Sequence, residues 1–158
     1  LNSSREWLTM KIILMRHGEA ENDTRPDSAR QLTDYGHQQA AQTAAYIAEH
    51  YAVDLFVVSP YKRAQQTLAQ LQSLLPAVPT TVSDNITPSD EAKVALAQLA
   101  TMDVKCMVVV CHMSLVAHLA SLLTEDMPES FALAEARVFD MEFVMSGMAY
   151  EIDRFVPS

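Results

Sequence analysis

Short apolar runs alternate with longer segments of helical periodicity along most of the chain. The runs predict strands over residues 11–15, 55–58, 80–82 and 106–111. Apolar positions at helical spacing predict helices over residues 34–49, 62–75, 89–99 and 114–123. Strands that alternate with helices predict a largely parallel sheet with helices on both faces, that is, a three-layer α/β/α fold.

Polar residues and a proline mark several of these helix ends. Thr33 is placed to cap the first helix, and Ser89, Asp90 and Glu91 form a capped start for the third. Pro76 stops the second helix, because proline cannot continue the hydrogen-bonding pattern.

The C-terminal part of the chain has a different pattern. Residues 138–143 and 149–155 alternate apolar with polar side chains, which predicts antiparallel edge strands. Gly147 lies between them and indicates a hairpin connection. The predicted fold is therefore α/β, with a mostly parallel central sheet and a C-terminal antiparallel edge hairpin.

Length and composition indicate one globular domain over residues 10–158. The chain has 158 residues, of which 49% are hydrophobic and 20% charged, as is usual for a folded domain of this size. Residues 1–9 lack the basic start and long apolar region of a signal peptide. We interpret them as a non-native or disordered N-terminal extension, with Met10 as the natural start.

Charge and cysteine usage narrow the classes of partner and the compartment. The net charge of −9 disfavours nucleic acid and anionic membranes, which are polyanions, and no apolar stretch approaches the ~20 residues of a membrane helix. Cys106 and Cys111 lie five positions apart in one predicted strand, so their side chains point to opposite faces and cannot form a disulfide. Reduced cysteines predict a cytoplasmic location.

Cationic or imidazole side chains follow three of the predicted parallel strands. The first is followed by Arg16-His17-Gly18, the second by a segment that contains Arg63, and the fourth by His112. Open α/β sheets bind ligands at the carboxyl ends of their strands. Guanidinium groups bind phosphate and an imidazole can attack phosphorus, so the pattern predicts a site for phosphoryl chemistry.

These motifs, taken in order, resemble those of the histidine phosphatase superfamily, the phosphoglycerate-mutase-like proteins. The family pattern is Arg-His-Gly near the start, Ser-Pro-x-x-Arg-Ala-x-x-Thr in the middle, here residues 59–67, and a late histidine after a strand. The resemblance runs from Met10 nearly to the end of the chain. The short chain and residues 111–116 look most like the bacterial phosphohistidine phosphatases of this family.

The resemblance implies a role for each of four residues. Arg16 and Arg63 would bind phosphate oxygens through their forked donors. His17 would be the nucleophile and form a covalent phosphohistidine. His112, in its protonated form, would donate to the transferring phosphoryl group.

The remaining histidines, His37, His50 and His118, are interpreted as surface or packing residues. A metal is the other way to use several histidines, but the sequence contains no HExxH motif and no paired-cysteine spacing. We therefore expect neither a metal nor another cofactor.

The general acid is not evident. Many family members carry a glutamate after the third strand, where this chain has Asn85; Asp84, Asp27 and Asp90 are the candidates to replace it. A phosphoramidate bond releases imidazole more readily than a phosphoester releases alkoxide, so a missing acid favours phosphohistidine as the substrate.

The spacing between the two arginines points to the same kind of substrate. Residues 19–31 predict a polar loop over the site, and only one helix fits between Arg16 and Arg63, so the site should be open enough to admit a phosphohistidine of another protein. The resemblance implies a histidine-containing phosphotransfer domain or a phosphocarrier protein, in phosphorelay signalling, as partner, and we expect a monomer. The alternatives are a phosphatase of small phosphoesters and a non-catalytic phosphate-binding module, which would have no need of His17.

Overall fold

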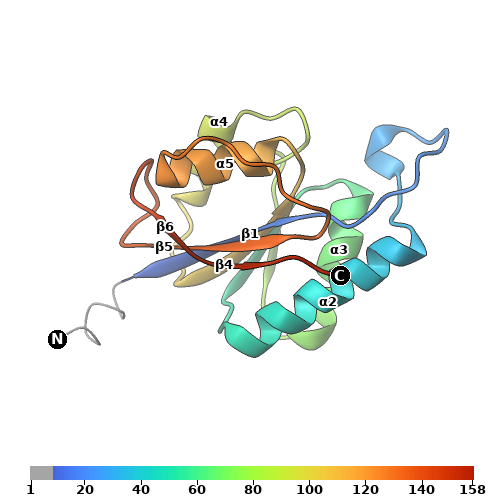
Figure 1. Ribbon diagram of the computed structural model, residues 1–158, viewed down its shortest axis with the longest axis horizontal. Coiled ribbons are helices and arrows are strands. Elements are labelled where there is room, and N and C mark those ends of the chain that lie inside the picture. The colour runs from blue at the N-terminus through green and yellow to red at the C-terminus, as the bar shows by residue number, and fades with distance from the viewer. Residues whose placement is uncertain (1–8) are drawn as a thin grey trace.

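The computed structural model describes residues 9–158, which form a six-stranded sheet between two layers of helices (Figure 1). The strands lie in the order β3-β2-β4-β1-β5-β6. Their bounds are Met10–Arg16 (β1), Leu55–Val58 (β2), Thr80–Val82 (β3), Cys106–Cys111 (β4), Ala136–Met141 (β5) and Tyr150–Phe155 (β6). The first four pair in parallel, whereas β5 runs antiparallel to both β1 and β6. The α/β fold with an antiparallel C-terminal hairpin is confirmed.

The helices cover the two faces of the sheet in pairs. They comprise α2 (Asp34–His50), α3 (Lys62–Leu74), α4 (Ala92–Leu99), α5 (Leu115–Thr124) and the short 3₁₀ helix η1 (Asp27–Ala29). Alternate residues of β1 enter different cores: Ile12 and Leu14 pack with α4 and α5, whereas Ile13 and Met15 pack with α2 and α3. A strand buried on both faces must be apolar throughout, which explains why the pattern in the sequence is a continuous run.

Most of the predicted boundaries agree with the structure to within a few residues. The cap of α2 is confirmed, because Oγ1 of Thr33 accepts a hydrogen bond of 2.9 Å from the backbone N–H of Gly36. Gly147 has the positive φ of 76° in the connection between β5 and β6. Cys106 and Cys111 are unpaired, buried and in different cores, as their spacing predicts.

Two details of the prediction are wrong. Helix α4 begins at Ala92 rather than at residue 89, because the carboxylate of Asp90 binds the backbone N–H and the hydroxyl of Thr87 instead of capping a helix. Strand β5 is not at an edge, because it lies between β1 and β6 and only β6 ends the sheet on this side.

No helix within residues 9–158 is long and apolar enough to cross a membrane. The predicted N-terminal extension, apart from Thr9, lies outside the described residues.

Candidate active site

Three neighbouring parallel strands bring the predicted site residues together at their carboxyl ends. Arg16 ends β1, Ser59 follows β2 and His112 follows β4, which lies between the other two strands. The rings of His17 and His112 lie 5.3 Å apart between centroids. Arg63 reaches the same point from the first turn of α3.

Two glycines allow the loop after β1 to pack against the start of α2. A Cβ on Gly18 would lie 2.5 Å from the carbonyl oxygen of Gly36, and a Cβ on Gly36 would lie 2.1 Å from that of Glu19. Both contacts are with backbone atoms and are too short for a side chain. The N–H of Gly18 donates to the hydroxyl of Thr67 at 3.1 Å, which ties this loop to α3.

The surroundings of His17 determine its tautomer. Its Nδ1 lies 2.7 Å from the carbonyl oxygen of Gly18, which can only accept, so Nδ1 carries the hydrogen. Nε2 accepts a hydrogen bond of 3.3 Å from Nε of Arg63. Burial, together with the nearby arginines, lowers the pKa of His17 to about 4. At neutral pH the ring is neutral and its lone pair on Nε2 faces the cationic part of the site.

His112 is held by Ser59. Its Nε2 lies 2.7 Å from Oγ of Ser59, and that oxygen accepts from the backbone N–H of Tyr61 at 3.1 Å. The hydroxyl has a second lone pair and one hydrogen, so it can donate to Nε2 or accept from it, and Nδ1 of His112 is a buried atom without a partner among the described residues. Burial, with His17 and Arg63 nearby, lowers the pKa of His112 to about 3. This favours a neutral ring, whereas the sequence analysis expects a protonated one.

Arg16 is directed by one backbone carbonyl. Its Nη1 donates to the oxygen of Phe131 at 2.8 Å, while its buried Nε has no partner among the described residues. A guanidinium held at one nitrogen, with an unpaired donor beside it, is arranged to bind an oxyanion.

Of the three candidates for the general acid, Asp27 alone contacts one of the other predicted site residues. Its carbonyl oxygen accepts from Nη1 of Arg63 at 2.7 Å and its carboxylate from Nη2 at 3.3 Å, while Arg30 binds the same carboxylate at 3.0 Å. Partial burial alone would raise the pKa of Asp27, but Arg63 and Arg30 outweigh it and hold the pKa below its usual value. The carboxylate is therefore ionised at neutral pH and has no proton to donate.

The other two candidates are engaged elsewhere or exposed. Asp90 binds Thr87 within its own turn, and Asp84 is exposed and makes no side-chain hydrogen bond within the described part of the chain. Asn85, at the position where the family's glutamate is expected, is partly buried.

The three remaining histidines lie at the surface, as predicted. His50 and His118 are exposed and His37 is half-buried, as expected for surface positions. Within residues 9–158, no group of three or more histidine, cysteine, aspartate or glutamate side chains is arranged to hold a metal.

The sequence reasoning assigned no role to three residues that shape the site. Ser59 orients His112, Thr67 holds the loop at Gly18, and Phe131 holds Arg16. Ser59 and Thr67 lie within the family motif, so the motif contained the signal. Phe131 acts through its backbone oxygen, which every residue type has, so the sequence could not indicate this contact.

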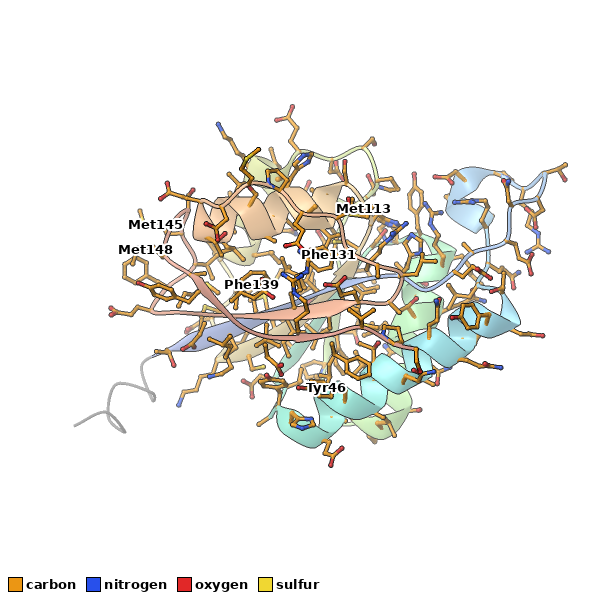
Figure 2. All side chains as sticks on the ribbon, viewed as in Figure 1. Tyr46, Met113, Phe131, Phe139, Met145 and Met148 are labelled. Atoms are coloured by element: carbon orange, nitrogen blue, oxygen red, sulfur yellow. The ribbon has the colours of Figure 1, made fainter. Side chains whose placement is uncertain are left out.

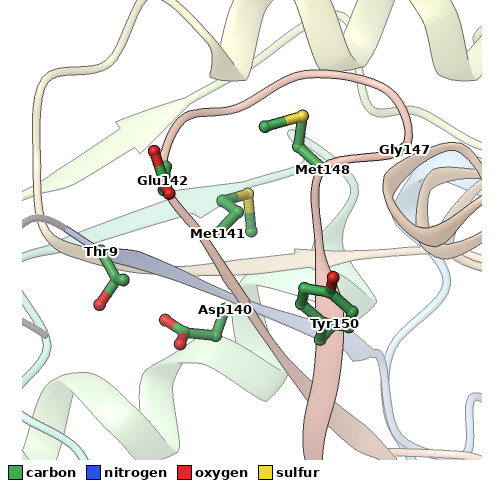
Figure 3. A pocket seen from close by; sticks show the side chains of 7 residues that line it. All are labelled: Thr9, Asp140, Met141, Glu142, Gly147, Met148 and Tyr150. Atoms are coloured by element: carbon green, nitrogen blue, oxygen red, sulfur yellow. The ribbon is translucent and has the colours of Figure 1, made fainter. Parts of the chain in front are cut away.

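A separate hollow lies at the other end of the sheet, near the start of β1 (Figure 3). Its lining includes Thr9, Met141, Tyr150 and the two carboxylates of Asp140 and Glu142. Two negative charges disfavour a phosphorylated ligand, so this hollow does not compete with the site around His17.

The fold and these side chains define an α/β protein with a neutral, oriented histidine beside two arginines, and comparison with known proteins identifies the family. Residues 12–87 match the histidine phosphatase superfamily (branch 1). The phosphohistidine phosphatase SixA homolog of Haemophilus influenzae is 33% identical over 135 residues, which cover 77% of this chain and 82% of that protein. SixA of Escherichia coli is 30% identical over 129 residues, covering 77% of this chain and 80% of that protein.

A solved structure agrees with this assignment. The protein histidine phosphatase SixA complexed with tungstate superposes with a TM-score of 0.83 at 26% identity, over 94% of this chain and 97% of the other. The chain belongs to the histidine phosphatase superfamily and is a phosphatase.

Proposed function

We propose that this phosphatase removes the phosphoryl group from a phosphohistidine on another protein, with His17 as the nucleophile. The observation that carries the proposal is the state of the His17 ring. It is neutral, its Nδ1–H is tied to Gly18, and the lone pair on Nε2 faces Arg63. A histidine that served only to bind phosphate would instead use a ring N–H or a positive charge toward the anion.

The proposed reaction has two displacements at phosphorus. Nε2 of His17 attacks, the P–N bond of the substrate breaks, and the substrate imidazole leaves with the electron pair and takes a proton from solvent. Water then attacks the phosphohistidine, and phosphate is released as the bond to Nε2 breaks. Arg16, Arg63 and the ring of His112 are the donors for the phosphoryl oxygens, where the transition state concentrates charge.

The carboxylates around the site support a nitrogen leaving group. Asp27 is ion-paired and ionised, and Asp84 and Asp90 make no contact with His17, Arg63 or His112. Alkoxide departure without a proton donor loses the ~10²-fold to 10⁴-fold that general acid catalysis contributes. An imidazole leaves more readily, so the site suits phosphoramidates.

The short segment between the two arginines supports a protein as the carrier of the phosphohistidine. One α-helix, α2, and the three-residue η1 lie between Arg16 and Arg63, so this part of the chain adds no domain over the site. The similarity to the SixA proteins supports a histidine-containing phosphotransfer domain or a phosphocarrier protein as the partner. The cytoplasmic location and the monomeric state remain predictions.

The test is a direct comparison of substrates at equal concentration. We expect a phosphohistidine protein and free phosphoramidate to be hydrolysed with kcat/KM values at least ~10²-fold above those of phosphoserine and a sugar phosphate. Equal or faster turnover of either ester would contradict the proposal and favour a phosphatase of small phosphoesters.

A variant tests the covalent role of His17. His17→Ala should abolish turnover of every substrate but still bind tungstate, because both guanidinium groups remain. The matched control is His118→Ala, which changes an exposed histidine and should retain normal rates. Trapping labelled phosphate on the unmodified enzyme, but not on His17→Ala, would identify the intermediate.

A further inference from the structure

We infer that Glu135 and Arg137, whose side chains contact none of the predicted phosphate-binding side chains, are positioning residues that aim Arg16 at the phosphoryl group. The inference deepens the proposed function, because it depends on Arg16 binding phosphate. Both residues are almost fully buried, with 3% and 2% of their surfaces exposed. They form an ion pair in which Nε of Arg137 lies 2.5 Å from Oε2 of Glu135.

The link to Arg16 is the peptide unit between Phe131 and Ala132. The carbonyl oxygen of Phe131 accepts from Nη1 of Arg16 at 2.8 Å, and the N–H of Ala132 donates to Oε1 of Glu135 at 2.7 Å. The C=O and N–H of one peptide unit point in opposite directions across a rigid plane. Glu135 therefore fixes the orientation of the carbonyl that holds Arg16.

Arg137 fixes the chain just before this peptide. It donates to the carbonyl oxygens of Glu129 at 3.1 Å and of Ser130 at 2.7 Å. Its guanidinium also stacks on the Phe131 ring, 3.8 Å from the ring centroid. On the other side of this segment, the N–H of Phe131 contacts the sulfur of Met113, and Figure 2 shows the two side chains near each other.

The same segment is also hydrogen-bonded to the backbone of Arg16 and His17. The N–H of Arg16 donates to the carbonyl of Glu135 at 3.1 Å, and the N–H of Ala134 donates to the carbonyl of His17 at 3.0 Å. Ala134 has a φ of 57°, a conformation that is unfavourable for a residue with a Cβ. The segment that contains Phe131 and Ala134 is thus held against Arg16 and His17 in a conformation that it would not adopt by local preference alone.

Stability alone does not account for this buried ion pair. Replacing a buried pair with well-packed apolar residues is often neutral or stabilising, because burial removes two charges from water. Here every bond that the pair makes to the backbone lies within three residues of Phe131. That placement matches a function in orienting the Phe131 carbonyl.

The experiment is a double-mutant cycle with phosphoramidate as the substrate and tungstate inhibition as a second readout. Arg137→Lys keeps the charge but loses the fork and the flat stacking surface, and should reduce kcat/KM and tungstate affinity about tenfold. Arg16→Ala should lose ~10²-fold to 10³-fold, as for one transition-state donor. In the double variant, Arg137→Lys should add no further loss, because its effect passes through Arg16.

The control is Arg154→Ala, which removes a cation from the same ion-pair cluster. Arg154 binds Glu129 and Glu151 and lies 3.8 Å from the carboxylate of Glu135, but it contacts no carbonyl next to Phe131, so its loss should change kcat/KM and tungstate affinity far less than Arg137→Lys does. Glu135→Gln is a second variant of nearly the same volume and should show a smaller loss in the same direction, whether or not Arg137→Lys folds.

Two results would overturn the inference. Normal kinetics in folded Arg137→Lys or in Glu135→Gln would show that the ion pair does not affect Arg16. An additive loss in the double variant would show that Arg137 acts independently of Arg16, as a general structural residue. Failure of the proposed function is separate, because it would appear in the wild-type enzyme as turnover of an ester that equals or exceeds the turnover of phosphoramidate.

Discussion

The guanidinium of Arg63 is shared between the nucleophile and a carboxylate, and this sharing defines the charge state of the site. Nε faces His17, while Nη1 and Nη2 bind the carbonyl and carboxylate of Asp27. Burial, with a smaller contribution from this arginine, lowers the pKa of His17, which stays neutral, and the arginine helps to keep Asp27 ionised. The phosphoryl group would take the place of Nε2 of His17 as the acceptor of Nε.

The first prediction separates a positioning carboxylate from a general acid. Asp27→Asn keeps an oxygen acceptor for Arg63 but cannot supply a proton, so kcat/KM should fall no more than about tenfold and equally for phosphoramidate and an alkyl ester. A loss of ~10²-fold or more that is confined to the ester would identify Asp27 as the acid. Asp23→Asn changes another exposed acid of the same loop and is the matched control.

A second prediction at this scale concerns the fork of Arg63. Arg63→Ala should reduce kcat/KM by ~10²-fold to 10³-fold, and Arg63→Lys should recover only part of it, because an ammonium group cannot face His17 and two oxygens at once. Steady-state kinetics with phosphoramidate measures both. Near-normal rates for Arg63→Ala would place the residue outside the chemistry.

Among the elements, α2 has a function beyond covering the sheet, because its first turn is the surface against which residues 18 and 19 pack. Thr33 caps the helix and Gly36 contacts the loop at Gly18 and Glu19. The backbone N–H of Glu19 also donates to the side chain of Gln39 at 2.9 Å. Helix α2 thus positions Gly18 and Glu19, the two residues that follow His17.

The third prediction tests this contact. In most helices glycine is less favourable than alanine by roughly 0.5–1 kcal/mol. Gly36→Ala should have the opposite sign and lower the free energy of unfolding by about 1–3 kcal/mol, because the new Cβ overlaps the Glu19 backbone. Urea unfolding should show the lower stability, and kcat/KM should fall as well. Gln38→Ala, at an exposed position in the same helix, should change neither quantity by much.

The sequence predicted elements well where the local pattern determines them, and less well where contacts between distant residues do. Residues 106–111 are apolar throughout and form the buried strand that this run predicts, and Thr33 has the geometry of a cap. Asp90 is a residue type that often caps helices, but here its carboxylate binds Thr87. The residue type alone does not decide between these two local hydrogen bonds. The contact between Arg16 and the Phe131 carbonyl joins positions 115 apart in the chain, and no pattern predicts it.

For the molecule as a whole, the distribution of charge matters more than the total. The net charge is −9, yet Arg16, Arg63, His17 and His112 are gathered at one end of the sheet. Two neutral imidazoles are buried beside two guanidinium groups, so protonation of either ring adds a positive charge to a site that is already cationic. The folded protein resists this protonation, whereas the unfolded chain does not.

The last prediction follows from that difference and concerns acid stability. The pKa values of His17 and His112 fall to about 4 and about 3 in the folded state, below the ordinary value near 6.5. Between those values the unfolded chain binds more protons, so the stability present above pH 6.5 is lost as the pH falls toward 4. Each histidine should lower the free energy of unfolding by about 2 kcal/mol between pH 7.5 and pH 5. Urea unfolding across this range measures how steeply the free energy of unfolding depends on pH. This slope should be roughly halved in His112→Asn and unchanged in His118→Asn. An equal slope in the wild type and both variants would mean that His112 is protonated as readily in the folded state as in the unfolded chain.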